Sequence, residues 1–127
     1  MNMLIGELAQ RSGVSARSLR YYEQNGLLTA RRDPNGYRVY DEDAVRLARE
    51  IGTLLARGFT LAETRPFVEC LRAGYEAGDA CPESLAVYRR KLAELDACID
   101  DLRATRDRVA AQLEAASPAC EFSRESP

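Results

Sequence analysis

Residues 5–28 read IGELAQRSGVSARSLRYYEQNGLL, and this stretch decides the fold. Apolar residues at helical spacing predict a first helix that Gly13 ends. Ser15 can cap a second helix, which Gly26 closes. Two short helices joined by a tight turn are typical of a helix-turn-helix, whose second helix would enter a major groove. The alternative is a small helical hairpin that binds no nucleic acid.

A short β-hairpin is predicted directly after these helices. Residues 33–36 read DPNG, a strong turn signal, and the following YRVY alternates as a strand does. Arg31 and Arg32 stand on one arm of this hairpin and Arg38 on the other. Arginines around a turn beside a basic helix favour an extended surface for phosphate contacts, although an ordinary solvated hairpin has the same pattern.

Helical spacing returns at Asp41, and that run stops at Gly58. Thr60 and Glu63 are three residues apart, in the arrangement of a capping box, and predict the start of another helix. Pro66 lies inside that segment and should kink the helix or delay its start.

A long helix is predicted over about 35 residues, because no glycine or proline occurs between Pro82 and Pro118. Pro82 suits the first turn of this helix, which makes Cys81 its N-cap residue. Apolar residues recur three and four positions apart along it, interrupted at Arg106, as in a coiled coil. We call this row the seam; its members are Leu85, Tyr88, Leu92, Leu95, Ile99, Leu102, Val109 and Leu113. Such a helix is about 50 Å long, so its seam needs a helix of a second chain, and a homodimer is expected.

The composition is that of an ordinary folded protein, with 30% charged and 46% hydrophobic residues among 127. No apolar run reaches the ~20 residues that cross a bilayer, and the first residues lack the pattern of a secretory signal. We therefore expect a cytoplasmic protein with no membrane contact, whose four cysteines are kept mainly as thiols.

Charge is unevenly distributed along the chain, whose net charge is −2. Residues 1–40 hold six arginines against three acids, whereas the remainder holds twelve basic residues against seventeen acidic ones. A basic amino-terminal third is typical of a protein that contacts a polyanion there. An enzyme finds no support, because the chain has no histidine, no phosphate-binding glycine loop and no convincing pair of carboxylates.

The order of these motifs resembles the MerR family of bacterial transcription regulators. The features that carry the resemblance are LRYYEQNGLL at the end of the second helix, NGYRVY in the hairpin and RGFTLAE between the next two helices. It covers about residues 3–113. The resemblance implies a mainly α protein: a winged helix-turn-helix with a short β-hairpin wing, followed by a long dimerisation helix that forms an antiparallel coiled coil.

The implied organisation has three parts. Residues 1–75 would form the winged helix-turn-helix DNA-binding domain with its helical extension, 76–116 the linker and dimerisation helix, and 117–127 a short tail. Family members bind double-stranded promoter DNA with an overlong spacer, and their activated form distorts that DNA so that RNA polymerase can engage. RNA polymerase is thus an indirect partner.

The resemblance also implies which residues contact DNA. Arginine can fork to phosphate or guanine edges, and tyrosine hydroxyls can reach phosphate. Leu19 is expected in the core, and one of Tyr21 and Tyr22 should pack inward, because neighbours on a helix do not share a face. The implied DNA-binding residues are Arg17, Ser18, Arg20, Tyr21 and Tyr22 of the recognition helix, Tyr37 and Arg38 of the wing, and Arg57 beyond the third helix.

Cysteines carry the implied sensing site. Cys81 matches the helix-start position that is cysteine in the family's divalent-metal sensors and serine in copper-type sensors. In an antiparallel dimer, Cys81 of one subunit and Cys120 of the other would meet. About ten residues follow the long helix, so we expect no appended drug-binding domain. Cys70 and Cys98 are expected to be packing residues.

The tail departs from the pattern of metal sensors. Ala116 stands where a first tail cysteine is expected, and no histidine replaces it. Two thiols suit a two-coordinate soft metal ion or a reversible intersubunit disulfide better than a structural zinc ion. The cofactor is therefore a soft metal ion bound by cysteines, or none. The alternative to sensing is a regulator with no effector, in which Cys81 only caps the helix.

Overall fold

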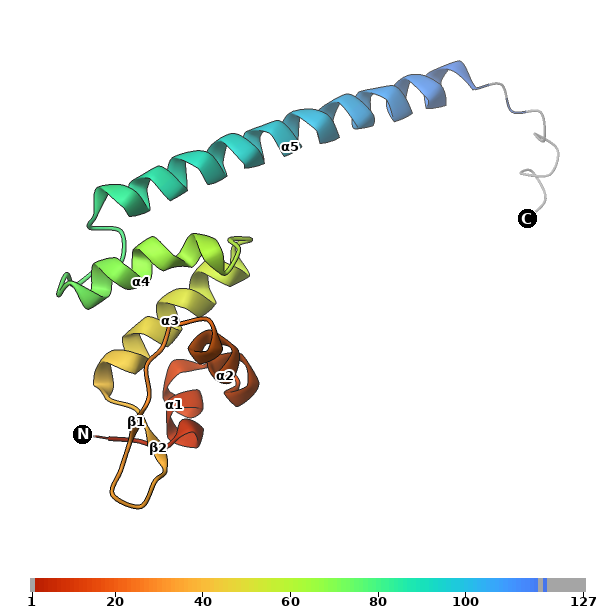
Figure 1. Ribbon diagram of the computed structural model, residues 1–127. Coiled ribbons are helices and arrows are strands. Elements are labelled where there is room, and N and C mark those ends of the chain that lie inside the picture. Colours follow the sequence, from red (N-terminus) through yellow and green to blue (C-terminus); the bar gives the residue numbers. More distant parts are fainter. Residues whose placement is uncertain (1, 117, 119–127) are drawn as a thin grey trace. The chain divides into compact units, whose positions relative to one another are not determined.

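The computed structural model describes residues 2–116 and residue 118 (Figure 1). The chain divides into two compact units, Met1–Arg89 and Arg90–Pro127, and each is described by itself. Within the described residues, no helix is both long and apolar enough to cross a membrane.

The helix-turn-helix forms as its local signals predict. Helix α1 (Ile5–Ser12) ends at Gly13, whose left-handed backbone (φ 75°) lets its amide donate to the carbonyl of Ala9 at 3.0 Å. Helix α2 (Ala16–Gln24) begins after Ser15, whose hydroxyl accepts from the amide of Ser18 at 3.1 Å. The predicted pair of helices is confirmed.

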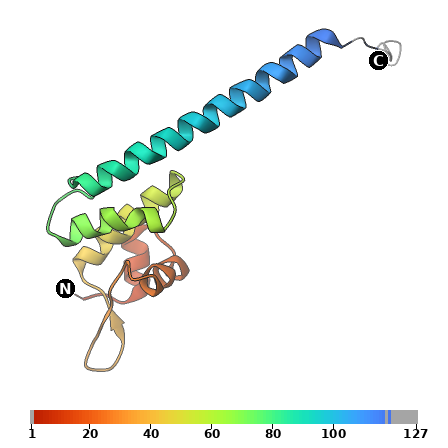
Figure 2. The ribbon, with the colours of Figure 1, turned by 45° about the horizontal axis from the view of Figure 1, so that its top comes forward.

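The wing is a two-stranded antiparallel hairpin of β1 (Arg31–Arg32) and β2 (Arg38–Val39), drawn as the loop beside the helices in Figure 2. One carboxylate oxygen of Asp33 accepts from the amides of Asn35 and Tyr37, both at 2.9 Å, and so closes the turn. The backbones of Tyr40 and Met3 exchange two hydrogen bonds of 2.8 Å. The wing is therefore anchored to the beginning of the chain.

Helix α3 (Glu42–Ala56) supplies the central packing face of the first unit. Its first turn is capped by Asp41, whose carboxylate accepts from the amide of Ala44 at 3.2 Å. Side chains of α1, α2 and the wing pack against the apolar face of α3. The buried members of this core are Met3, Leu8, Leu19, Tyr22, Leu27, Leu28, Tyr40, Ala44, Val45, Leu47, Ala48, Ile51 and Val68.

The next helix starts late, as the position of its proline predicts. The Thr60 amide donates to the Glu63 carboxylate at 2.8 Å, and the Glu63 amide donates to the Thr60 hydroxyl at 3.2 Å, which confirms the capping box. A 3₁₀ turn, η1 (Ala62–Thr64), follows, and α4 (Arg65–Arg72) has Pro66 in its first turn. Proline fits there because its missing N–H has no helical partner to lose.

An aromatic cluster joins the end of α3, helix α4 and the first turns of α5 (Pro82–Ala115). The ring of Phe67 lies 6.2 Å from that of Phe59 and 5.1 Å from that of Tyr88, centre to centre. Tyr88, which the spacing assigns to the seam, therefore packs within the first unit.

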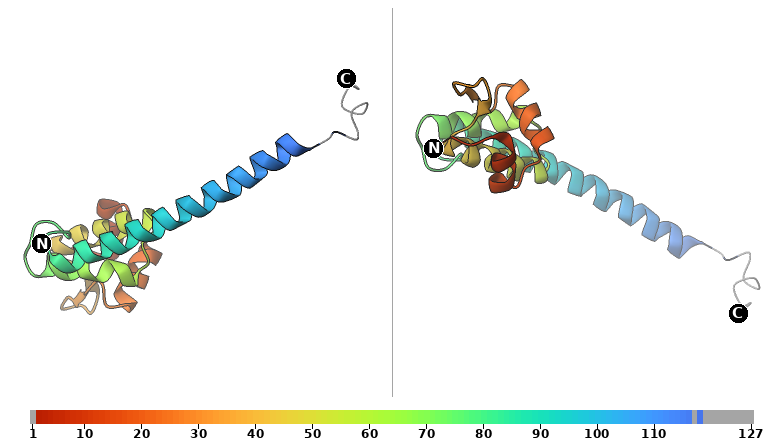
Figure 3. Two further views of the ribbon diagram at one scale, coloured as in Figure 1. Left: turned by 90° about the horizontal axis from the view of Figure 1, so that it is seen from above. Right: turned by 90° about the horizontal axis from the view of Figure 1, so that it is seen from below.

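In the part of the second unit that the structure describes, the main element is the remainder of α5, a single helix of 34 residues counted from Pro82 (Figure 3). Its length confirms the prediction of about 35 helical residues. The large apolar side chains of the seam in this unit are exposed: Leu92, Leu95, Ile99, Leu102, Val109 and Leu113. A row of this kind along one chain is what a coiled-coil partner would cover.

Candidate functional site

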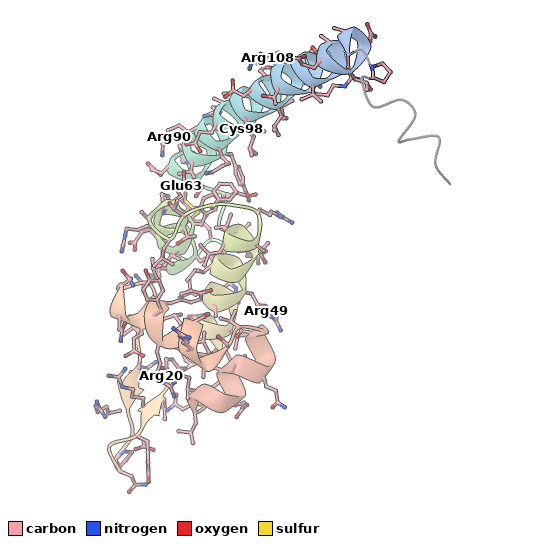
Figure 4. All side chains as sticks on the ribbon, turned by 90° about the vertical axis from the view of Figure 1, so that its right-hand side faces the viewer. Arg20, Arg49, Glu63, Arg90, Cys98 and Arg108 are labelled. Atoms are coloured by element: carbon pink, nitrogen blue, oxygen red, sulfur yellow. A yellow bond between two sulfur atoms is a disulfide. The ribbon has the colours of Figure 1, made fainter. Side chains whose placement is uncertain are left out.

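The exposed face of α2 carries the predicted basic residues. Arg17 and Arg20 are exposed, and Ser18 is half-buried because its amide and hydroxyl serve the N-cap (Figure 4 labels Arg20). Tyr21 is 54% exposed, whereas Tyr22 is only 4% exposed and belongs to the core. The expectation that one of the two tyrosines packs inward is confirmed for Tyr22. The ring of Tyr22 is buried in the core, so Tyr21 is the tyrosine of α2 that is exposed to solvent.

The wing presents Tyr37 and Arg38 as exposed side chains, and a carboxylate of α2 fixes one of them. Glu23 forms an ion pair with Arg38 and also accepts a hydrogen bond of 2.7 Å from the hydroxyl of Tyr40. The helix and the wing are therefore joined by charge and by a hydrogen bond. The sequence reasoning missed the roles of Glu23 and Tyr40. The available signal was that Glu23 is the one acidic residue in the otherwise basic α2.

A surface hollow of about 630 Å³ lies between α2 and the wing. Three arginines line it: Arg20 from α2, and Arg32 and Arg38 from the two strands. Glu23 also lines the hollow and pairs with Arg38, so the local charge is net positive and favours an anionic ligand such as a phosphate backbone. Of the residues predicted to contact DNA, Arg20 of α2 and Tyr37 and Arg38 of the wing line this hollow together. Arg17, Ser18 and Tyr21 do not line it.

Arg57 lies elsewhere on the first unit. It is exposed at the C-terminal end of α3, where it lines a different hollow of about 460 Å³ with Arg46 and Arg49. The structure does not bring it into the hollow lined by Arg20 and Arg38. A role in DNA binding would therefore require a contact at a separate point on the duplex.

Tyr40 is the titratable group most altered by this arrangement. Burial, followed by the hydrogen bond to Glu23, raises its pKa from 10.0 to about 12. The fold favours the neutral phenol, so its contribution to stability is complete below pH 10 and is lost as the pH rises through 12.

We expect the tyrosinate absorbance of the folded protein, read by rapid mixing into alkali, to include a step near pH 12. This step should be missing from Tyr40→Phe, which removes the ionising hydroxyl. The matched control is Tyr37→Phe, since Tyr37 is 62% exposed, and it should retain the step. An unchanged titration of Tyr40→Phe at pH 12 would contradict the assignment.

Helix α4 holds the C-terminal end of α2. The guanidinium of Arg65 donates to the carbonyl of Asn25 at 2.9 Å, and that of Arg72 donates to the carbonyl of Gly26 at 3.3 Å. Cations at the C-terminal end of a helix satisfy its last carbonyls and complement its dipole. The sequence reasoning did not find this connection, because it joins residues about 40 positions apart.

Cys81 occupies the N-cap position of α5, as predicted. Its carbonyl accepts from the amides of Ser84 at 3.1 Å and Leu85 at 3.3 Å, the first helical bonds. The structure pairs its sulfur with that of Cys70 in a disulfide within the chain, with 6.0 Å between the two Cα atoms.

This pairing adds a contact that the sequence-based account of the cysteines did not contain. Cys70 is buried, as expected of a packing residue, but it is also the partner of Cys81, which was not anticipated. The expected partner, Cys120, lies outside the described residues. Cys98 is exposed on α5 and has no disulfide (Figure 4).

At the start of α5 the described residues offer two soft ligands, the sulfurs of Cys70 and Cys81, and no larger set of ligands. No group of three or more His, Cys, Asp or Glu side chains within the described part of the chain is arranged to hold a metal ion. Two thiolates suit a two-coordinate soft ion and not a four-coordinate structural zinc site. Any further ligand would have to come from outside the described residues.

Comparison with protein families agrees with this geometry. The family described as "MerR HTH family regulatory protein" matches residues 3–69, and "MerR, DNA binding" matches residues 45–112. The HTH-type transcriptional regulator HmrR of Rhizobium leguminosarum bv. viciae is 36% identical over 105 residues, which cover 82% of this chain and 78% of that protein.

Another curated relative is longer than this chain. The nodulation protein NolA of Bradyrhizobium elkanii is 33% identical over 117 residues, which cover 81% of this chain and 53% of NolA. The chain thus spans about half the length of that relative.

Two solved structures share the architecture. The transcription regulator PbrR691 from Ralstonia metallidurans CH34, in complex with lead(II), is 28% identical, with a TM-score of 0.71 over 91% of this chain and 88% of that one. HiNmlR, a MerR family regulator lacking the sensor domain and bound to promoter DNA, is 25% identical, with a TM-score of 0.58 over 90% of this chain and 85% of that one.

Proposed function

Because the chain belongs to the MerR family of DNA-binding transcription regulators, we propose that it acts as a homodimer that changes promoter geometry when a thiol-reactive signal reaches Cys81. Members of this family are not enzymes. The observation that carries the DNA-binding part of the proposal is the hollow between α2 and the wing, which Arg20, Arg32 and Arg38 line.

The DNA contacts follow from that hollow. The recognition helix α2 would enter the major groove with Arg17, Ser18, Arg20 and Tyr21, while Tyr37 and Arg38 of the wing would contact the adjacent backbone. The ion pair with Glu23 holds Arg38 in place beside α2. Arg57, at the end of α3, would contact phosphate at a separate point.

A homodimer is proposed because the seam of α5, apart from Tyr88, is apolar and exposed in the single chain. Leu102, for example, is 70% exposed, and rows of large apolar side chains rarely stay in water without a function. An antiparallel coiled coil would cover the seam and place two recognition helices on one promoter. This arrangement supports binding to a pseudo-palindromic site.

Switching would then be a change in the DNA imposed by the dimer. Bending or untwisting a promoter costs on the order of several kcal/mol, which a two-state dimer can supply or withhold according to its effector. RNA polymerase would then bind a promoter whose geometry has changed.

The signal is placed at Cys81 because a thiol at the N-cap of a long helix is stabilised as thiolate by the helix dipole. The relative PbrR691 was solved with lead(II), which supports a soft metal ion as one candidate signal. An oxidant is the other. The partner thiol of Cys81 is then Cys70 of the same chain, as in the structure, or Cys120 of the second subunit, as the family resemblance implies.

DNA binding by α2 is tested with Arg17→Ala. The probe is a duplex that the protein selects from a random-sequence pool. We expect affinity at least about tenfold weaker than that of the parent, because each subunit loses one contact between a guanidinium and a phosphate. The slope of log affinity against log salt concentration should also fall by about two for the dimer.

Arg108→Ala is the matched control, since it removes an exposed arginine from α5 and should change neither quantity (Figure 4). If Arg17→Ala keeps the affinity and the salt slope of the parent, then α2 does not contact the duplex as proposed.

A further inference from the structure

We propose that Cys70 and Cys81 are a reversible oxidation site, which a hydroperoxide converts from two thiols into a disulfide that locks α4 to the start of α5. The chemistry of this site stands by itself, and only its effect on promoter DNA rests on the proposed function. In this proposal the primary thiol reaction joins Cys81 to Cys70 of the same chain. It takes the place of the intersubunit contact between Cys81 and Cys120.

The backbone already holds the two residues at bonding distance. Their Cα atoms are 6.0 Å apart, inside the range of 4.4–6.8 Å that disulfides occupy. Cys70 lies in α4 and Cys81 at the N-cap of α5, and eleven positions separate them in the sequence. Because both belong to the first unit, the bond needs no second subunit.

The linker between the two cysteines is fixed by hydrogen bonds. The Ser84 hydroxyl donates to the carbonyl of Gly78 at 2.6 Å, and Arg46 of α3 donates to the carbonyls of Tyr75 and Glu76 at 3.2 and 3.0 Å. Gly78 packs so closely that a Cβ there would clash with the Glu50 carboxylate. A linker held at these points keeps the two thiols facing each other.

The two thiols differ in access, which assigns their roles. Cys81 is half-buried and borders a surface hollow of about 520 Å³, large enough for a hydroperoxide, whereas Cys70 is only 2% exposed. The N-terminal end of the 34-residue α5 favours a negative sulfur at Cys81. Cys81 is therefore the attacking thiolate, and Cys70 is the resolving thiol.

The reduced state also has a partner for Cys70. Its sulfur lies 3.4 Å from the carbonyl oxygen of Ala77, so a thiol there can donate a hydrogen bond that a disulfide cannot. Both redox states of Cys70 are thus accommodated without an unpaired buried donor. This property suits a bond that forms and breaks repeatedly.

The reaction balances with the hydroperoxide as a two-electron oxidant. The Cys81 thiolate attacks the peroxide oxygen, the O–O bond breaks and Cys81 becomes a sulfenic acid, while the leaving alkoxide or hydroxide takes a proton. The Cys70 sulfur then attacks the Cys81 sulfur, the S–O bond breaks, and the Cys70 proton leaves with the oxygen as water. A small thiol reverses the bond by disulfide exchange.

The lock lies next to the contacts that hold the recognition helix. Arg65 and Arg72, on either side of Cys70 in α4, donate to the carbonyls of Asn25 and Gly26 at the end of α2. A constraint on α4 therefore acts one helix away from the DNA-binding face. We expect oxidised and reduced protein to differ at least about fivefold in affinity for the selected duplex, as for a modest allosteric coupling.

Trypsin separates the candidate pairs, because the four cysteines fall on four peptides: 58–72, 73–89, 92–103 and 109–124. The reduced full-length protein is treated with hydrogen peroxide, its free thiols are alkylated, and the digest is analysed by mass spectrometry without reduction. We expect peptides 58–72 and 73–89 to be joined and the other two to be alkylated. A joint between 73–89 and 109–124, or four alkylated peptides, would overturn the proposal.

Variants assign the two roles and separate the two hypotheses. Cys70→Ser should trap Cys81 as a sulfenic acid that a 1,3-dione probe labels, and it should abolish the redox effect on affinity. Cys98→Ser, which changes an exposed thiol, should behave as the parent does. If the peptides are joined but the protein binds the selected duplex equally well in both redox states, the proposed effect of the disulfide on DNA binding is refuted. Joined peptides with no DNA binding in either state would refute the proposed function and leave the oxidation site standing.

Discussion

A protein carrying Ile99→Asp is expected to sediment as a monomer at concentrations where we expect the parent to be a dimer. Ile99 belongs to the seam and is 43% exposed in the single chain, so a partner helix would have to bury the new carboxylate. Two such carboxylates per dimer, without partners, should weaken dimerisation on the order of 100-fold or more. Affinity for the selected duplex should fall with it, because a monomer engages only one half-site.

The control for this experiment is Ala104→Asp, which adds the same charge to α5 on the side of the helix opposite the seam. It should leave both the sedimentation and the affinity as they are in the parent. Circular dichroism distinguishes dissociation from loss of helix. If Ile99→Asp remains dimeric while Ala104→Asp dissociates, the dimer uses another face of α5.

Phe67→Ala should lower the free energy of unfolding of the first unit by about 3–5 kcal/mol. Phe67 is fully buried, and its ring packs against Phe59 and Tyr88, so truncation leaves a cavity between α3, α4 and the start of α5. Urea unfolding followed by tyrosine fluorescence measures the loss. A marginally stable domain would be partly unfolded by a change of this size.

Tyr75→Ala is the reference for that measurement, because Tyr75 is an aromatic residue of the same unit that is about half exposed. Its effect should stay within about 0.5 kcal/mol. A loss below about 1 kcal/mol for Phe67→Ala would show that the aromatic cluster is not a principal source of stability, and the close packing of α5 on α4 would need another explanation.

Most elements of the fold could be predicted from local signals, because their causes lie within a few residues. Ser15 caps α2 through the amide of Ser18, and Gly13 ends α1 with a left-handed backbone. The capping box of Thr60 and Glu63 likewise uses a spacing of three residues. Each of these interactions can be read from the chain without knowing what packs against it.

The connections within the candidate site could not be predicted in this way. Glu23 meets Arg38 and Tyr40 across 15 and 17 positions, and Arg65 reaches Asn25 across 40. Such partners are chosen by how helices pack, which a helical or strand period does not specify. The resemblance supplied the residues proposed to face DNA but not the side chains that contact them.

The cysteines show the same limit. The position of Pro82 was enough to place Cys81 at the start of α5, because proline in the first turn is a local rule. Its bond to Cys70 depends on how α4 lies beside that start, so periodicity alone offered no reason to pair them. The same reason applies to Tyr88. It packs in the aromatic cluster and not in the seam, because Phe67 of α4 lies against its ring.

The hydrogen bonds from Arg65 and Arg72 to the end of α2 set a rule for engineering promoter specificity. Consider a chimera that takes only the helix-turn-helix and wing from a relative. The carbonyls at positions 25 and 26 would then come from the relative, whereas Arg65 and Arg72 would still be positioned for the original loop. The segment to exchange therefore extends through α4. Grafts that end before Thr60 should read DNA poorly even when every DNA-facing side chain has been copied.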